Sequence, residues 1–268
     1  MTNEPPLSDE IDEAIDWRGE PVVCGSCPHL ELQALRKCQP LRACVFDRYA
    51  RRIDRFFDWN PELGSHYVRH PYFEVRACAA KTAEVFLLPA LLDDPEEAVR
   101  WSAARRLPKR YLLKLRHDAH REVRIRVAQR LDPEELHAMM FDDDYAVRQI
   151  VARRVAAPLL TGMICDPELE VRRVVAQRIP PSSLAAMAGD EDAAVRVEVA
   201  QRLDPASLVA LAGDPDWRVR YEVARRAPPP VVKKMLEDPD PIVQETARER
   251  EPGETARRPL SIGAAEEN

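Results

Sequence analysis

A 24-residue repeat constrains the fold of this chain more than any other feature of its sequence. A valine recurs without insertion or deletion at eight positions: Val75, Val99, Val123, Val147, Val171, Val195, Val219 and Val243. Arginine follows this valine in the first seven copies, and Gln244 follows it in the eighth. A fixed period in this range is typical of a solenoid, in which each unit packs mainly on its neighbours. We therefore expect a stack of repeats rather than one central core.

The apolar positions of each repeat follow a helical spacing. Counted from the repeat valine, valine or alanine at +4 and leucine or isoleucine at +8 continue one i, i+4 stripe, and alanine occupies +5 beside it. Aspartate stands at +19 in the first seven copies, and proline follows it in four of them. An Asp-Pro pair predicts an N-cap followed by the first helical turn, so we expect a helix of about 13 residues. Prolines at +9 to +11 prevent that helix from continuing.

A second apolar pair, at +13 and +16, follows these prolines. The intervening segment is too short for a full helix, and an i, i+3 pair is what a 3₁₀ turn buries. No repeat has the alternating pattern of a strand. The predicted fold class is therefore all-α: a solenoid of eight repeats in residues 71–250, each with one α-helix and one short 3₁₀ helix. Gln244 and Arg248 depart from the pattern, so the eighth copy is predicted to be a frayed cap, followed by a flexible tail at 251–268.

Four cysteines lie outside the repeats, in the N-terminal segment 21–70. Cys24, Cys27, Cys38 and Cys44 have the spacing C-x2-C-x10-C-x5-C. Four thiolates can enclose one soft metal centre, and both Zn²⁺ and iron–sulfur clusters take four cysteines. The spacing does not decide between them, because Cys38 and Cys44 form no zinc knuckle and the sequence lacks the compact cysteine run of ferredoxins. His29 is expected to be solvated or to lie beside the ligands, with zinc ligation as the alternative.

The rest of the N-terminal region is predicted to be a tail and a cap. Residues 1–20 are acidic and are expected to form a solvated tail with a short helix at 11–17. Residues 45–58 place Phe46 and Ile53 on one helical stripe with charged residues opposite, which predicts an amphipathic helix. A solenoid needs its open end covered, so we expect this aromatic helix to pack on the first repeat.

Arginine forms two further columns, at +1 and +7. Both lie at the edge of the apolar arc, and we expect their guanidinium groups to bind the aspartate at +19 and nearby carbonyls. The alternative is an anion-binding surface, favoured at 105–130, where ten Lys or Arg residues meet only Asp118 and Glu122. Helical repeats can present such a patch to nucleic acid, but the stretch lacks interleaved aromatic residues. Cys78 and Cys165 are expected to be surface or half-exposed thiols.

Several classes of protein are disfavoured by composition. Residues 71–250 hold 29 Lys+Arg and 30 Asp+Glu, so no general attraction to nucleic acid or anionic membrane is expected. The sequence shows neither a signal peptide nor a run of about 18 apolar residues, and we predict a cytoplasmic protein whose cysteines are ligands or free thiols. No phosphate loop, His–carboxylate pair or nucleophile motif occurs, so we predict no enzymatic activity.

A repeat of the form D-P-x-x-x-V-R-x-x-V-A-x-R-L-x-P-x-x-L-x-x-L behind four cysteines resembles the leucine-rich repeat variant (LRV) family, over roughly residues 20–250. The resemblance implies a right-handed superhelix of alternating α- and 3₁₀-helices without a β-sheet. It also implies a [4Fe-4S] cluster held by the four cysteines, with zinc as the alternative. We expect a scaffold for an unknown protein partner, with the cluster in a structural or redox-sensing role. The alternatives are an electron-transfer protein and nucleic-acid binding through 105–130.

Overall fold

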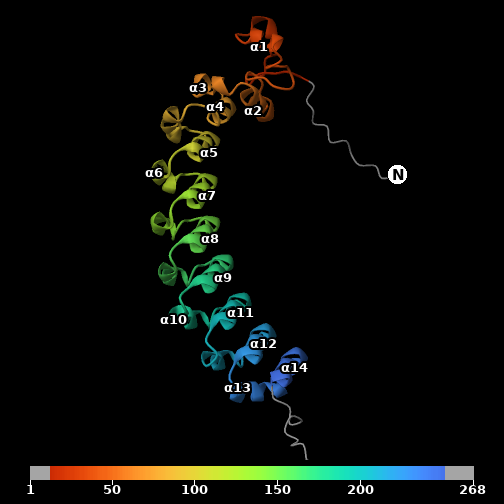
Figure 1. Cartoon of the computed structure of the whole chain (residues 1–268), viewed down its shortest axis with the longest axis vertical. Coiled ribbons are helices and arrows are strands. Elements are labelled where there is room, and N and C mark those ends of the chain that lie inside the picture. Colours follow the sequence, from red (N-terminus) through yellow and green to blue (C-terminus); the bar gives the residue numbers. More distant parts are fainter. Residues whose placement is uncertain (1–12, 251–268) are drawn as a thin grey trace, which may run out of the picture. The chain divides into compact units, whose positions relative to one another are not determined.

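The computed structural model describes residues 13–250, which belong to two compact units divided between Met139 and Met140 (Figure 1). The first unit contains the N-terminal segment and the first repeats, and the second contains the remaining repeats. The described residues contain helices and two isolated β-bridges but no strand, so the all-α fold class is confirmed. No helix within residues 13–250 combines the length and apolar character needed to cross a membrane.

Each repeat contributes one long helix. The bounds are α4 Phe73–Ala79, α5 Glu97–Arg106, α7 Arg121–Arg130, α8 Tyr145–Arg154, α9 Leu169–Arg178, α11 Ala193–Arg202, α12 Trp217–Arg226 and α14 Pro241–Arg250. From α5 to α12 these helices end at the arginine at +7, and the next residue is extended, so each helix stops before the proline that follows it. Within the first unit α4 packs on α5 and α5 on α7, and within the second α8, α9, α11, α12 and α14 pack in that order.

The helices begin later than predicted. Helix α5 starts at Glu97, three residues after Asp94, which is therefore not its N-cap. The Asp94 carboxylate instead accepts a hydrogen bond from the Glu96 N–H at 3.0 Å and ion-pairs with Arg76. The Asp-Pro pair thus turns the chain ahead of the helix. Side-chain caps occur nearer the helix start in three repeats: Asp144, Asp192 and Asp216.

Short helical segments follow each long helix up to α12. The 3₁₀ segments are η3 Val85–Asp93, η4 Leu113–His117, η5 Pro133–Met139, η6 Ala157–Met163, η7 Ala185–Met187, η8 Ser207–Leu211 and η9 Met235–Glu237. In three repeats a short α-helical stretch comes first: α6 Lys109–Leu112, α10 Pro181–Leu184 and α13 Pro229–Lys234. The predicted 3₁₀ turns are confirmed, with this α-helical extension as a refinement.

The predicted apolar columns form the core. All eight repeat valines and all seven alanines at +5 have no exposed surface. The leucine column at +13 is equally buried, from Leu88 to Leu208, and Val232 continues it at 2% exposure. Burying one such valine or leucine side chain stabilises the fold by about 1.5–3 kcal/mol. Alanine at +5 leaves room for the close approach of neighbouring helices.

The N-terminal segment contains shorter elements: η1 Cys24–Ser26, α1 Leu30–Ala34, α2 Ala50–Trp59, η2 Pro61–Leu63 and α3 Gly64–Tyr67. Helix α2 packs on α4 and buries Ile53, Phe56 and Phe57, which confirms the predicted cap on the first repeat. This helix begins at Ala50 rather than at residue 45. Asp47 stabilises the turn before this helix, because its carboxylate accepts hydrogen bonds from the Tyr49 N–H at 3.0 Å and from Arg52 at 2.9 Å.

The described part of the acidic tail differs from its prediction. Residues 13–17 form no helix, and Ile15 makes an isolated bridge with Pro21. The Trp17 ring stacks on Tyr72, with 6.0 Å between centroids and an interplanar angle of 8°. An aromatic pair of this kind stabilises the fold by about 0.5–1.5 kcal/mol beyond the area it buries. The rest of the predicted tail, and the tail at 251–268, lie outside the described residues.

Candidate metal centre

A tight hairpin brings the third and fourth cysteines together. Gln39 and Ala43 exchange backbone hydrogen bonds of 2.9 and 2.8 Å, so Cys38 and Cys44 lie directly outside this pair. Arg36 and Leu41 turn the chain with φ angles of 57° and 62°, in the left-handed region that residues with a Cβ adopt at a cost. The five residues between Cys38 and Cys44 therefore form a hairpin rather than a zinc knuckle.

The first two cysteines lie on the turn of η1. The Cys27 N–H donates to the Cys24 carbonyl at 3.1 Å, which closes that turn. Cys24 and Cys27 are half-buried, whereas Cys38 and Cys44 are buried. Two thiols thus face the surface and two face the protein.

The four thiols lie within electrostatic reach of one another. The Cys44 thiol donates a hydrogen bond to the Cys38 sulfur, and this bond, more than burial, raises the pKa of Cys44 and lowers the pKa of Cys38. The pKa of Cys24 is raised by burial first, then by Cys44 and Cys27. In the part of the chain that the structure describes, no three His, Cys, Asp or Glu side chains are grouped tightly enough to hold a metal ion.

Backbone groups around the thiols fit a thiolate-held cofactor. The His29 N–H donates to the Cys27 sulfur at 3.4 Å, and the Phe46 N–H donates to the Cys44 sulfur and lowers the pKa of that thiol. Hydrogen bonds of this kind stabilise thiolates and tune the potential of iron–sulfur clusters. Four soft donors with amide support therefore suit an iron–sulfur cluster or zinc.

His29 joins the aromatic side chains of the predicted cap, a contact that the sequence did not predict. The His29 ring packs between Phe46 and Phe56, and its Nε2 hydrogen-bonds to the Tyr67 hydroxyl. Burial, followed by the nearby Cys27, raises the pKa of Tyr67 to about 12. Burial is also the main cause that lowers the pKa of His29. His29 is therefore half-buried beside Cys27 rather than solvated.

Side chains of helix α2 fasten the cysteine loops to the cap. The buried Asn60 amide donates to the Lys37 carbonyl at 2.8 Å, next to Cys38. Arg55 donates to the Arg42 carbonyl at 3.0 Å, within the hairpin. The position of these loops thus depends on α2, which itself packs on the first repeat.

The arginines at +1 form internal ion pairs, as predicted. Arg196 is representative: its Nε and Nη2 donate to Asp214 at 2.7 and 2.9 Å, and its Nη1 donates to the carbonyls of Asp190 and Glu191. Each such arginine joins the segment before its helix to the segment after it. The same pairing occurs at Arg76–Asp94, Arg100–Asp118, Arg148–Asp166, Arg172–Asp190 and Arg220–Asp238.

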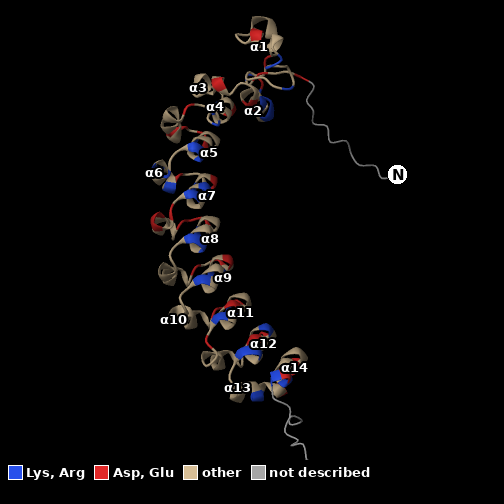
Figure 2. Cartoon of the chain, viewed as in Figure 1, with Lys and Arg blue, Asp and Glu red and all other residues tan. Residues whose placement is uncertain are grey.

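The arginines at +7 bind the end of the preceding helix. Arg202 donates to the carbonyls of Ala176 and Ile179, at the C-terminus of α9. The terminal carbonyls of a helix lack intrahelical partners and carry partial negative charge, so a cation there stabilises the helix. Within each unit the blue segments that recur on the long helices in Figure 2 include these two columns. The internal interpretation of both columns is therefore confirmed.

The basic stretch 105–130 presents less free charge than its composition indicates. Lys109 and Lys114 form ion pairs with Asp132 and Asp93, and Arg106, Arg124 and Arg130 donate to backbone carbonyl groups inside the repeats. The sequence also contains an aromatic residue that the prediction overlooked. Trp101 lies under the guanidinium groups of both Arg105 and Arg126.

The two remaining cysteines differ from each other. Cys165 is exposed, as predicted. Cys78 was predicted to be at least half-exposed but is only 4% exposed, because α2 covers this side of α4 and the Cys78 sulfur lies 3.8 Å from the Ala50 carbonyl. Burial raises its pKa to about 12. The capping helix, absent from later repeats, explains the difference.

Comparisons with known proteins agree with this architecture. The family described as "LRV protein FeS4 cluster" matches residues 14–66. An uncharacterized 27.7 kDa protein in the nifB 3' region of Rhodobacter capsulatus is 48% identical over 99 residues, which cover 37% of this chain and 40% of that protein. The solved structure of a leucine-rich repeat variant with a novel repetitive structural motif matches with a TM-score of 0.79 and 38% identity, over 85% of this chain and 97% of that chain.

The repeat columns, the absence of strands among residues 13–250 and the cysteine segment thus agree with the structural and family matches. The chain belongs to the leucine-rich repeat variant family and is an iron–sulfur helical-repeat protein.

Proposed function

We propose that this chain is a non-enzymatic, cytoplasmic interaction scaffold whose N-terminal cap is held by a [4Fe-4S] cluster bound to Cys24, Cys27, Cys38 and Cys44. The cluster supplies four metal–thiolate bonds and, when exposed to oxidants, a redox-sensitive link. The hairpin provides two of the thiols and the η1 turn provides the other two. Backbone N–H groups donate hydrogen bonds to the sulfurs of Cys27 and Cys44.

A variable face of the repeats supports the scaffold role. Valine at zero and arginine at +1 and +7 are nearly constant between repeats, and they are used for packing and ion pairs. Positions +2 and +6 share one helical face and differ from repeat to repeat. Residues at +6 are all exposed: Lys81, Arg105, Gln129, Arg153, Gln177, Gln201, Arg225 and Glu249. A face that the fold does not constrain is available for a partner.

Unpartnered polar atoms on this face of the second unit carry the proposal. The Nε of Arg173, at +2, and the Oε2 of Glu222, at +3, are buried and lack hydrogen-bond partners among the described residues. Gln177 donates to Glu198 at 2.7 Å and Gln201 to Glu222 at 3.4 Å, so polar groups link neighbouring helices across the face. A buried polar atom without a partner costs about 1–3 kcal/mol. A rearrangement of these side chains on partner binding would let the two atoms form hydrogen bonds and would recover part of that free energy.

Site-specific photo-crosslinking in cells tests the scaffold role. A photoreactive residue at Gln201, on the variable face of α11, should give a discrete crosslink to the same partner in repeated experiments. The matched control is Val209, which is 58% exposed on η8 of the same repeat but lies outside the variable face. Crosslinks of equal pattern at both positions, or none at Gln201, would contradict the scaffold role.

Electron transfer is the second candidate, because exposed apolar side chains surround the half-buried Cys24 and Cys27. Val23, Leu30 and Leu35 are 65%, 51% and 68% exposed. An apolar surface next to a cofactor suits transient docking of a redox partner. A reversible reduction potential within the cellular range, with reduction slowed by Leu35→Asp, would favour this function over a structural cluster. Nucleic-acid binding is less favoured, since ion pairs and hydrogen bonds to carbonyls engage several basic side chains of the 105–130 stretch.

A further inference from the structure

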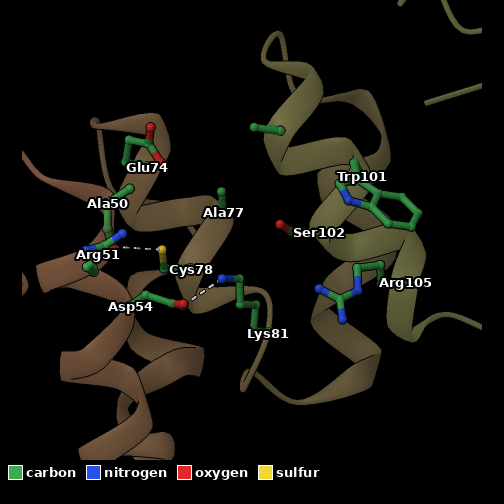
Figure 3. A pocket seen from close by; sticks show the side chains of 11 residues that line it. Ala50, Arg51, Asp54, Glu74, Ala77, Cys78, Lys81, Trp101, Ser102 and Arg105 are labelled. Carbon is green, nitrogen blue, oxygen red and sulfur yellow. Dashed lines mark hydrogen bonds and ion pairs between the residues drawn. The ribbon is translucent and has the colours of Figure 1, made fainter. Parts of the chain in front are cut away.

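A pocket of about 440 Å³ lies within the first unit, between helices α2, α4 and α5. Figure 3 shows α2 as one wall, with Arg51 and Asp54, and α5 as the opposite wall, with Trp101 and Arg105. Helix α4 forms the floor. This pocket is separate from the cysteine segment and involves none of the four proposed ligands.

Small side chains create the hollow. Ala50, Ala77 and Ala98 line it, where longer side chains would fill the space between the helices. Trp101 and Arg105 occupy the +2 and +6 positions of α5, so the pocket opens on the variable face. The alanine side chains and the indole ring suit an uncharged, apolar portion of a ligand.

Three polar groups facing the pocket lack ion-pair or hydrogen-bond partners. The Ser102 side chain is only 7% exposed, and its hydroxyl has no partner within the described residues. Neither Arg51 nor Arg105 forms an ion pair within residues 13–250; the Arg105 guanidinium lies 5.9 Å from the centre of the Trp101 ring. The Ser102 oxygen is not among the fully enclosed polar atoms of the described residues, so it keeps access to the pocket, where a ligand or water can hydrogen-bond to it.

The remaining charges of the pocket leave it slightly positive. Lys81 is paired with Asp54 at 2.7 Å, so these two groups largely neutralise each other. Glu74 is the one further carboxylate that lines the pocket, against the two guanidinium groups of Arg51 and Arg105. Guanidinium groups bind carboxylates through paired hydrogen bonds, and an aromatic ring packs on an apolar body.

We propose that this pocket binds a small organic anion, whose carboxylate meets Arg105, Arg51 and the Ser102 hydroxyl and whose apolar body packs on Trp101 and the alanines. Benzoate is the probe that tests this, since it combines a carboxylate with an apolar ring. Titration of the anaerobically purified full chain should give saturable binding by calorimetry, together with a change in tryptophan fluorescence that Trp101→Phe removes. Benzylammonium, which has the opposite charge, should not bind.

Three variants separate a built site from a non-specific one. Arg105→Gln should weaken benzoate binding by about tenfold, through the loss of a charge-assisted hydrogen bond. Ser102→Ala should weaken it by a few-fold. Glu74→Gln should tighten it by about threefold, because a repelling carboxylate is removed. Tighter binding after a mutation is an outcome that loss of folding does not produce.

The matched control is Arg153→Gln, since Arg153 is an exposed +6 residue of α8 outside the pocket. This variant should bind benzoate as the parent does. Equal affinity in the Arg105, Glu74 and Arg153 variants, equal binding of benzylammonium, or no saturable binding of benzoate would overturn the proposal. Binding of inorganic phosphate as tight as that of benzoate would also overturn it, because the apolar body would then contribute nothing.

Discussion

The cysteine segment and the repeats are stabilised in different ways. The repeats bury the same apolar columns again and again, and their charged groups are paired inside the stack. The cysteine segment leaves Val23, Leu30 and Leu35 exposed and buries little besides Cys38 and its neighbours at 43–45. Its turns also contain residues in the left-handed region. Apolar packing and internal ion pairs therefore stabilise the repeats, whereas we expect the cysteine segment to depend on its four thiols.

This difference has a consequence for how each region responds to damage. A repeat that loses one contact keeps its neighbours, because stability in such arrays is close to a sum of local terms. The cysteine segment has few substitutes for a lost ligand, although Asn60 and Arg55 hold its loops on α2. Mutations in the two regions should therefore differ in the number of residues that they destabilise as well as in the free energy that they cost.

The largest expected effect is that of Cys38→Ser. Loss of one of four ligands should abolish stable iron binding and raise hydrogen exchange throughout residues 21–58, since a small segment of this kind relies on its metal centre for stability. The repeats should retain their helical circular dichroism. Iron and acid-labile sulfide analysis after anaerobic purification, with hydrogen exchange, measures both effects. About four iron and four sulfide per parent chain are expected for a [4Fe-4S] cluster.

The control for this variant is Cys165→Ser, at the exposed cysteine of the second unit. It should leave iron content and hydrogen exchange unchanged. Global loss of circular dichroism in Cys38→Ser would show that the repeats depend on the cysteine segment. One zinc and no iron in the parent would contradict the cluster assignment, and with it the redox-sensing and electron-transfer roles.

Asp214→Ala tests the repeats with the next largest effect. The change leaves the Arg196 guanidinium, which is only 11% exposed, without its carboxylate. Breaking a buried pair from one side costs about 3–5 kcal/mol. We expect denaturant unfolding to show that loss, with iron content unchanged. Glu245→Ala removes a largely exposed partner of Arg248 and should cost less than about 1 kcal/mol. Equal losses in the two variants would contradict the internal role of the arginine column.

Gly64→Ala tests the boundary between the two regions. A Cβ at Gly64 would lie 2.7 Å from the Ala83 backbone nitrogen and 2.3 Å from the Thr82 hydroxyl oxygen, so α3 must move away from α4. Overpacking of this kind costs about 2 kcal/mol. Thermal unfolding and hydrogen exchange at residues 60–83 measure the effect. Gly189→Ala is the matched control, since nothing lies within 4 Å of its added Cβ. If both variants were equally stable, the close contact would have no energetic importance.

The repeats could be predicted from the sequence because the same buried positions and helix-ending residues recur in each copy. Eight copies of the valine define the buried stripe, and the prolines define the helix ends. The later start of each helix could not be predicted, because Asp94 satisfies both a turn N–H and the guanidinium of Arg76, which lies 18 residues earlier in the chain. An Asp-Pro pair has the same appearance whether it caps a helix or accepts a distant arginine.

For the cysteine segment, only the four sulfur donors could be predicted from the sequence. The four thiols are evident from the sequence, but the hairpin that brings Cys38 near Cys44 depends on Leu41, a residue in the left-handed region that is not glycine. The burial of Cys78 and the His29–Tyr67 contact depend on packing between segments far apart in the chain. Each of these contacts occurs only once in the described residues, so no repeated sequence pattern predicts it.

The smallest expected effect is a pH dependence confined to the repeats. Burial raises the pKa of Asp118, but hydrogen bonds from Arg100 and from the His120 N–H lower it further, so its pKa in the folded chain lies below the ordinary value of 3.8. A depressed pKa stabilises the fold fully above the unfolded value, and this contribution is lost as the pH falls through the folded pKa.

Asp118→Asn lacks that titration. It should be less stable than the parent by about 1.5 kcal/mol at pH 7, because a hydrogen bond to a charged group is lost, and the gap should shrink once the pH falls below about 4. Denaturant unfolding of both proteins across this range measures the gap. Glu245→Gln should show almost none, since that carboxylate is 66% exposed. A gap that stays constant with pH would mean that Asp118 acts through shape rather than charge. The repeats would then be held by packing alone, and the contrast with the cysteine segment would be sharper than the ion pairs indicate.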